Sequence, residues 1–241
     1  MSEPILTLSG VSADIDQYHI LHGVDLAIPA GELTVLLGRN GAGKSTTLRT
    51  IMGLTTVTAG QIRFRGEDIT SQPTPRIARK GIAFVPENMG IFSMLSVREN
   101  LLLAAVSGAM DEQRLAWIFD LFPPLKKFWE RPAGNLSGGQ KQMLAIARAV
   151  IEPRELLLVD EPTKGLAPAI INDLADAFEQ LKSQQVSILL VEQNFNFSRR
   201  LGQTVAVMSD GRIVHQGTMA ELADNEDQQR ELLGLGLGEH Q

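Results

Sequence analysis

The sequence contains no cysteine, so neither disulfides nor thiolate metal sites can form. It also has no run of the roughly 20 apolar residues that a membrane-spanning helix needs. Its first ten residues lack the basic segment and the long apolar core of a signal peptide. The four histidines lack the spacing of metal ligands. We therefore expect a cytoplasmic chain that reaches a membrane only by docking to another protein.

A basic excess is absent as well. The net charge of −6 argues against a nucleic-acid partner, although a local basic groove is compatible with it. Hydrophobic residues make up 44% of the chain and charged residues 21%, as in an ordinary globular protein. A length of 241 residues allows one large domain or a domain with an inserted lobe.

The order of apolar patterns predicts three regions. The part before residue 70 reads as strands interrupted by one helix that starts near Gly43. Residues 90–152 read as a helical lobe, and strands and helices alternate after it. The polar and then glycine-rich end, 226–241, reads as a loose tail. The expected strands are 5–8, 20–28, 33–37, 61–65, 156–159, 186–191, 205–208 and 212–215, and the expected helices follow Ser96 or span 111–121, 138–151 and 169–183.

A phosphate-binding loop follows the apolar run 33–37. Its residues are Gly38, Arg39, Asn40, Gly41, Ala42, Gly43, Lys44 and Ser45, with Thr46 in the first turn of the next helix. The glycines let successive N–H groups point at phosphate oxygens, and the helix presents its positive end to the same anion. Lys44 should reach the β- and γ-phosphates, and Ser45 should ligate Mg²⁺. A chance match is the alternative, and the loop alone does not separate GTPases, kinases, helicases and transporters.

Two adjacent carboxylates end the apolar run 156–159. Asp160 is held at the carboxyl end of a strand, where parallel sheets place ligands, and should bind Mg²⁺ through water. Glu161 should orient or deprotonate the attacking water. Such a pair can also be a solvated turn, but the phosphate-binding loop favours the functional interpretation.

A second anion site is predicted at residues 136–140, which read Leu-Ser-Gly-Gly-Gln. Ser137 begins a helix with a hydroxyl group and free backbone N–H groups. An ordinary helix cap with flexible glycines would look the same. One chain does not need two such sites for one triphosphate, whereas two chains placed head to tail do.

These three segments together resemble the nucleotide-binding subunit of an ABC transporter, in order and in spacing, over nearly the whole chain. Residues 38–45 match the Walker A motif, 136–140 the family signature and 156–161 Walker B. The resemblance implies an α/β P-loop NTPase fold with a mixed central sheet, an antiparallel β subdomain and an inserted helical lobe. It divides one domain into a core (1–89 and 153–225), the lobe (90–152) and the tail. It also implies that Ser137 and Gly139 contact the γ-phosphate across a dimer.

Three departures from the broad family pattern point to one branch. Glu87 stands where the Q-loop usually has glutamine; it could still ligate Mg²⁺ and adds negative charge. The loop 163–168 lacks its closing aspartate, and Gln193 replaces the switch histidine as a group that forms hydrogen bonds but does not titrate. Together they resemble the ATPases of branched-chain amino acid uptake systems and related urea and amide importers.

The adenine-stacking aromatic ring is a fourth departure. Ile15 occupies its expected position, and the nearby Tyr18 either substitutes for it or is a turn residue.

The resemblance implies an ATPase subunit with ATP and Mg²⁺ as cofactors, peripheral on the cytoplasmic face of the cell membrane. Its partners would be a second ATPase subunit, two membrane permeases and, indirectly, a periplasmic solute-binding protein. The branch favours a paralogue over a second copy as the ATPase partner, and the solute stays open. One rival is a non-transport ABC ATPase acting on ribosomes or DNA, which usually has two cassettes or a coiled-coil insertion. Another is a regulatory module with a degenerate site, against which the intact Lys44, Ser45, Asp160 and Glu161 argue.

Overall fold

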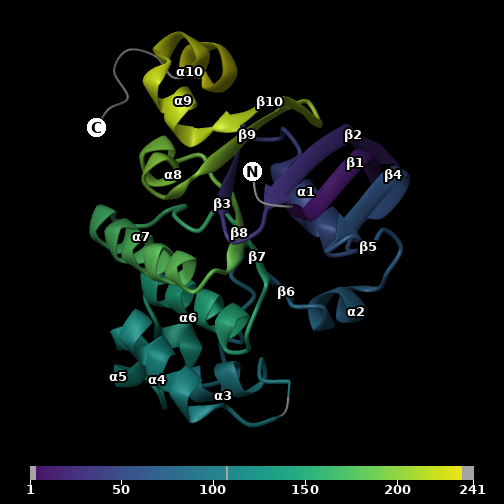
Figure 1. The fold of residues 1–241 in the computed structure, drawn as a ribbon. Coiled ribbons are helices and arrows are strands. Elements are labelled where there is room, and N and C mark those ends of the chain that lie inside the picture. Colours follow the sequence, from purple (N-terminus) through teal and green to yellow (C-terminus); the bar gives the residue numbers. More distant parts are fainter. Residues whose placement is uncertain (1–3, 107, 235–241) are drawn as a thin grey trace.

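The computed structural model describes residues 4–106 and 108–234, which form two sheets and a helical lobe (Figure 1). The smaller sheet is antiparallel, in the order β2-β1-β4-β5. Its strands are β1 (Pro4–Ile15), β2 (Tyr18–Pro29), β4 (Thr56–Phe64) and β5 (Glu67–Asp68).

The larger sheet runs in the order β10-β9-β3-β8-β7-β6. Its neighbours are parallel except for β10, which pairs antiparallel with β9 at one edge. The strands are β3 (Leu33–Leu37), β6 (Ile82–Val85), β7 (Leu156–Asp160), β8 (Ser187–Val191), β9 (Thr204–Ser209) and β10 (Arg212–Thr218). Because the carboxyl ends of parallel strands meet at one edge, the segments after β3, β6, β7 and β8 come together there.

Apolar side chains cover both faces of this sheet. Along β3, Leu33, Val35 and Leu37 pack into the core shared with the lobe, while Leu36 packs into the core shared with the smaller sheet. Every residue of β3, β7 and β8 is buried. A strand that is apolar throughout therefore fits between the two cores, as parallel strands require.

The helical lobe lies at the bottom of Figure 1, opposite the last two helices. It consists of α3 (Val97–Leu102), α4 (Glu112–Leu121), α5 (Pro123–Lys127), the 3-10 turn Ala133–Asn135 and α6 (Gly138–Val150). Ser96 and Ser137 form capping boxes at the starts of α3 and α6. α4 ends at Leu121 as expected, and the next residues but one, Pro123 and Pro124, start α5, because proline is well tolerated in the first helical turn.

The remaining helices surround the large sheet. They are α1 (Lys44–Ile51), α2 (Thr74–Arg79), α7 (Pro168–Ser183), α8 (Phe195–Leu201), α9 (Met219–Asp224) and α10 (Glu226–Leu233). The expectation of a loose tail is wrong for residues 226–233. Asn225 caps α10 through the N–H of Gln228, and Glu226 pairs with Arg230 one turn on. Residues 235–241 lie outside the described part. Among the described helices, none is both long and apolar enough to cross a bilayer.

Candidate functional site

The phosphate-binding loop joins β3 to α1 through backbone that favours glycine. Gly38, Gly41 and Gly43 have φ angles of 150°, 81° and 107°. At Gly38, a Cβ atom would lie 2.3 Å from the carbonyl oxygen of Met208 in β9. Any side chain there would push the loop off the sheet, so glycine is required for the loop to turn.

Lys44 extends along this loop. Its Nζ donates to the carbonyl oxygens of Gly38 at 2.9 Å and Arg39 at 3.1 Å, and lies 3.8 Å from Oε1 of Glu161. Burial lowers the pKa of Lys44, and the nearby Glu161 and Asp160 oppose that shift. The ammonium therefore lies between the loop and the end of β7, where a phosphate chain in the loop would meet it.

Asp160 is buried at the end of β7, with a side chain only 4% exposed. Its Oδ1 accepts a hydrogen bond of 3.0 Å from Oγ of Ser45. Burial raises the pKa of Asp160 to about 6, and the charges of Glu161 and Glu87 add to that effect. The carboxylate is thus held in a place where its negative charge is unfavourable without a cation.

Asp160→Asn should therefore stabilise the chain at about pH 7.5 in the absence of divalent cations and nucleotide. Between about pH 4 and pH 6 the folded wild type keeps a proton that the unfolded chain has lost, so its stability falls with rising pH through this window. The variant has no carboxyl group at this position, so it does not lose this stability, which amounts to about 2 to 3 kcal/mol. Urea unfolding of both proteins across this range would measure it. A difference that does not grow with pH, or one matched by the exposed control Asp173→Asn, would contradict it.

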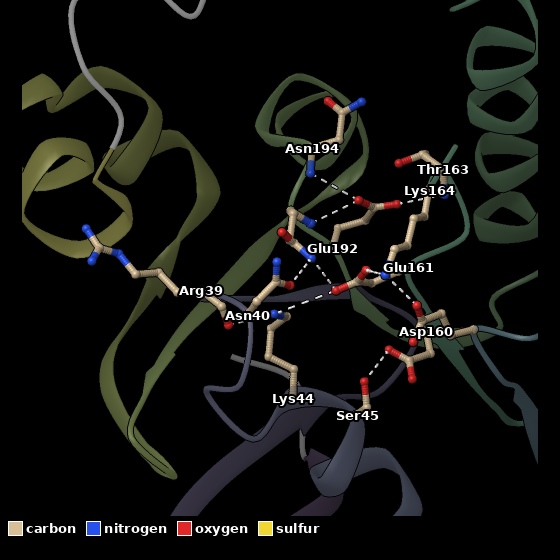
Figure 2. Close-up of polar contacts among 12 residues, drawn as sticks. Arg39, Asn40, Lys44, Ser45, Asp160, Glu161, Thr163, Lys164, Glu192 and Asn194 are labelled. Atoms are coloured by element: carbon tan, nitrogen blue, oxygen red, sulfur yellow. Dashed lines mark hydrogen bonds and ion pairs between the residues drawn. The ribbon is translucent and has the colours of Figure 1, made fainter. Parts of the chain in front are cut away.

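Glu161 follows Asp160 with a left-handed backbone, at φ 44°. A non-glycine residue there is strained, and here the N–H of Glu161 is fixed on the carbonyl oxygen of Val191 in β8. Nε2 of Gln193 donates to Oε1 of Glu161 at 2.5 Å and to Oδ1 of Asn40 at 2.7 Å. Gln193 therefore joins the phosphate-binding loop to the carboxylate, and Figure 2 shows the two side chains that it links, Asn40 and Glu161.

Comparison with known proteins identifies the family of this chain. The family model "ABC transporter" matches residues 21–164. This chain belongs to the ABC transporter family.

Two relatives match this ABC ATPase over almost their full lengths. The high-affinity branched-chain amino acid transport ATP-binding protein BraG of Pseudomonas aeruginosa is 41% identical over 92% of this chain and 96% of its own. The probable branched-chain amino acid transport ATP-binding protein LivF of Archaeoglobus fulgidus is 37% identical over 93% and 97%.

Solved structures agree on the fold. An ATP-binding subunit of an ABC transporter superimposes with a TM-score of 0.80 at 29% identity, covering 98% of this chain and 97% of that one. An ATP-binding cassette in its ADP conformation, at 24% identity, reaches 0.81. The predicted fold class is confirmed. The chain is an ATPase of this family that binds nucleotide.

The cavity at the loop holds about 320 Å³. Most predicted site residues from the loop and from Walker B line it together, and Ile20 and Lys164 join them without having been predicted. The lining is Ile20, Asn40, Gly41, Gly43, Lys44, Ser45, Thr46, Glu87, Glu161 and Lys164. Asp160 does not line the cavity itself, but it accepts a hydrogen bond from Ser45, which does.

Four predicted residues from outside the loop and Walker B do not line this cavity: Gln193, Tyr18, Ser137 and Gly139. Tyr18 is 65% exposed at the tip of the β1–β2 hairpin, paired with Ile15. Ser137 caps α6 by accepting from the N–H of Gln140, and Gly139 is packed so tightly on α7 that a Cβ would lie 2.5 Å from Cγ2 of Ile170. Contact of these residues with nucleotide stays a prediction.

Arg39 contributes its backbone, and not its side chain, to the contacts of the phosphate-binding loop. Its side chain points away from Lys44 and Glu161 in Figure 2. A Cβ at Gly234, the residue that ends α10, would lie 2.4 Å from its Nη2. The guanidinium therefore packs at the carboxyl end of α10, where the helix dipole favours a cation.

Glu192 is a buried residue that motif matching did not identify. It is 2% exposed, and it accepts hydrogen bonds from the N–H groups of Thr163, Gln193 and Asn194 at 3.0, 3.0 and 3.1 Å. Burial raises its pKa, and these bonds oppose the shift. Glu192 thus ties the loop after Walker B to the loop that carries Gln193. An acidic residue directly after an apolar strand was the available signal.

Lys164 is the second residue that was missed. Its Nζ lies 2.5 Å from Oε1 of Glu87 and 3.5 Å from Oε2 of Glu161. The negative charge that Glu87 adds to the Q-loop is therefore offset within the site. The signal was a lysine three residues after the Walker B glutamate, but its partner in the Q-loop is 77 residues away.

Proposed function

We propose that this ABC ATPase energises an importer of branched-chain amino acids or of a related small polar solute. The observation that carries the proposal is the likeness to BraG, which extends over 96% of the length of that protein and names such a transport system. Glu87 in the Q-loop and Gln193 in the switch loop support the same branch.

The site residues divide the chemistry of ATP cleavage among them. Backbone N–H groups of the loop and Lys44 hold the β- and γ-phosphates and offset their charge. Glu161 orients a water molecule and accepts its proton while the water oxygen attacks the γ-phosphorus in line. The bond from that phosphorus to the bridging oxygen breaks and leaves ADP. Gln193 fixes Oε1 of Glu161, so Oε2 is the oxygen that faces the water.

Mg²⁺ fits the oxygen donors at the end of β7. Ser45 and Asp160 would hold it, and Glu87 borders the same cavity. The described residues contain no cluster of three acidic or histidine ligands. Mg²⁺ does not need one, because it usually binds through one or two carboxylates and completes its shell with water and phosphate. When bound, it would neutralise charge on the phosphates, and it would supply the cation that buried Asp160 lacks.

A second ATPase subunit would complete the nucleotide site from outside. Ser137 and Gly139 stand apart from the cavity of their own chain, so contact with a γ-phosphate requires another molecule placed head to tail. The N-terminus of α6 supplies N–H groups and a positive dipole end for that contact.

Permease subunits would dock beside the Q-loop and hold the chain at the cytoplasmic face of the membrane. Phe92 and Met94 follow Glu87 in this loop and are 49% and 90% exposed. In the adjoining part of the lobe, Leu103 and Val106 are exposed as well. Large apolar side chains that gather in this way often mark a protein interface. A periplasmic solute-binding protein would deliver the solute to those permeases.

Reconstitution tests this proposal. The chain would be assembled in proteoliposomes with the permeases and the solute receptor of such an importer, and uptake of labelled leucine would be measured with and without internal ATP. We expect ATP-dependent uptake that Lys44→Ala abolishes, because Lys44 supplies the positive charge within the phosphate-binding loop. The exposed control Lys126→Ala should transport normally. Uptake that persists in Lys44→Ala, or ATP hydrolysis stimulated by ribosomes or DNA rather than by solute, would refute the proposal.

A further inference from the structure

Neighbouring strands place two glutamates at matched positions of the site. β6 and β7 are parallel, with Val85 opposite Val159, and Glu87 and Glu161 each follow two residues later. Asp160, the residue before Glu161, adds a third carboxylate whose charge interacts with both glutamates. Like charges at this spacing repel each other, so the arrangement requires a cation among them.

Lys44 lies 3.8 Å from Glu161, and Lys164 is the cation that reaches Glu87 as well. It contacts Glu87 at 2.5 Å and approaches Glu161 at 3.5 Å. We propose that Lys164 is a positioning residue shared by these two carboxylates: Glu87 holds its ammonium and thereby keeps Oε2 of Glu161 open for water. This inference rests on the proposed function, because it takes Glu161 as the base.

The backbone of Lys164 is fixed while its side chain is largely exposed. The turn that carries it is closed by bonds from the N–H of Lys164 to the Glu161 carbonyl at 3.2 Å and from the N–H of Leu166 to the Thr163 carbonyl at 3.1 Å. Glu192 anchors the same turn through Thr163. The side chain of Lys164 is 58% exposed, so its ammonium can move between the two carboxylates without any change in the fold.

The two oxygens of Glu161 are not equivalent. Oε1 accepts from Gln193, and Oε2 faces Lys164. A general base needs a lone pair directed at water. An ammonium that moved from 3.5 Å into direct contact would occupy the lone pair of Oε2. The shorter contact with Glu87 holds it back.

This arrangement links the Q-loop to the base. Glu87 belongs to the same loop as Phe92 and Met94, the exposed apolar residues that we assign to permease docking. A displacement of that loop that carried Glu87 away would release Lys164 onto Glu161 and stop hydrolysis. The position of the membrane partner would then control the water-facing oxygen through one side chain.

A double-mutant cycle tests the inference. Steady-state hydrolysis of MgATP would be measured for the full chain with Glu87→Gln, Lys164→Gln and both. We expect Glu87→Gln to lower kcat about three- to tenfold with an unchanged KM, because the lysine then closes on Glu161. Lys164→Gln alone should lower kcat less than Glu87→Gln does, because no ammonium is left to close on Glu161. The double variant should return to within about twofold of Lys164→Gln. Removing an exposed ion pair barely changes stability, so all variants should fold.

The pair Lys80 and Glu67 supplies the matched control, since its ion pair of 2.6 Å lies away from the site. Lys80→Gln and Glu67→Gln should leave kcat unchanged. A loss in Glu87→Gln that persists in the double variant, a raised KM, an equal loss in Lys164→Gln or no loss at all would overturn the inference. Glu161→Gln separates the two claims. If it keeps full turnover, the assigned base and this inference both fail, whereas a normal loss there with any of those results refutes the inference alone.

Discussion

Replacing Glu161 by glutamine should lower ATP turnover by about 10²- to 10⁴-fold while ATP still binds. The amide has nearly the same shape, and its oxygen can still accept from Nε2 of Gln193, so the site should keep its geometry. It cannot accept a proton from water at neutral pH. The variant therefore still binds ATP but no longer stabilises the transition state, so the loss appears in kcat.

Single-turnover hydrolysis and equilibrium binding of ATP would measure the two effects separately. Glu179→Gln is the matched control, because that glutamate is 49% exposed and pairs with Arg200 at the surface. Its turnover should equal that of the wild type. If Glu161→Gln hydrolyses ATP at the wild-type rate, the base lies elsewhere; if it loses ATP binding, Glu161 holds the substrate instead.

The parts of this site that the sequence predicts are those whose chemistry is local. The phosphate-binding loop, the capping box at Ser137 and the carboxylates after β7 each depend on residues a few positions apart, so a short pattern identifies them. The contact of Lys164 with Glu87 joins residues that are far apart in the chain, and only the strand order brings them together. Short helices such as α8 and α9 were not predicted for a related reason, since six or seven residues show little periodicity.

The hairpin residue that lines the cavity shows a second limit of prediction from sequence. Counting along the chain directed attention to Ile15 and Tyr18, but Ile20 is the hairpin residue that lines the cavity. Register irregularities between Val11 and Ala13 and between Ala13 and Asp14 change which residues of β2 face the loop. Because side chains alternate along a strand, a single bulge reverses the faces beyond it, and spacing alone does not reveal bulges.

Glu192→Ala should lower the free energy of unfolding by about 1 to 3 kcal/mol, because one of the N–H groups that the carboxylate accepts from is buried and two are part-buried, and should also impair turnover. The carboxylate is the acceptor for three backbone N–H groups, those of Thr163, Gln193 and Asn194, and alanine leaves them without that acceptor. Each unsatisfied buried group costs about 1 to 3 kcal/mol. Urea unfolding and steady-state hydrolysis at a temperature where the variant is folded would measure the two losses.

The loss of activity follows from where those N–H groups lie. Two of them hold the loop that presents Gln193 to Glu161, and the third holds the turn of Lys164. Glu192→Gln keeps one acceptor oxygen and should fall between the wild type and alanine in both measurements. Glu155→Ala, which removes a surface ion pair with Arg65, should cost less than about 1 kcal/mol and no turnover. Equal stability losses in Glu192→Ala and Glu155→Ala would mean that the buried carboxylate does not hold the two loops together. A destabilised Glu192→Ala with normal kcat would mean that the orientation of Gln193 does not matter to the reaction.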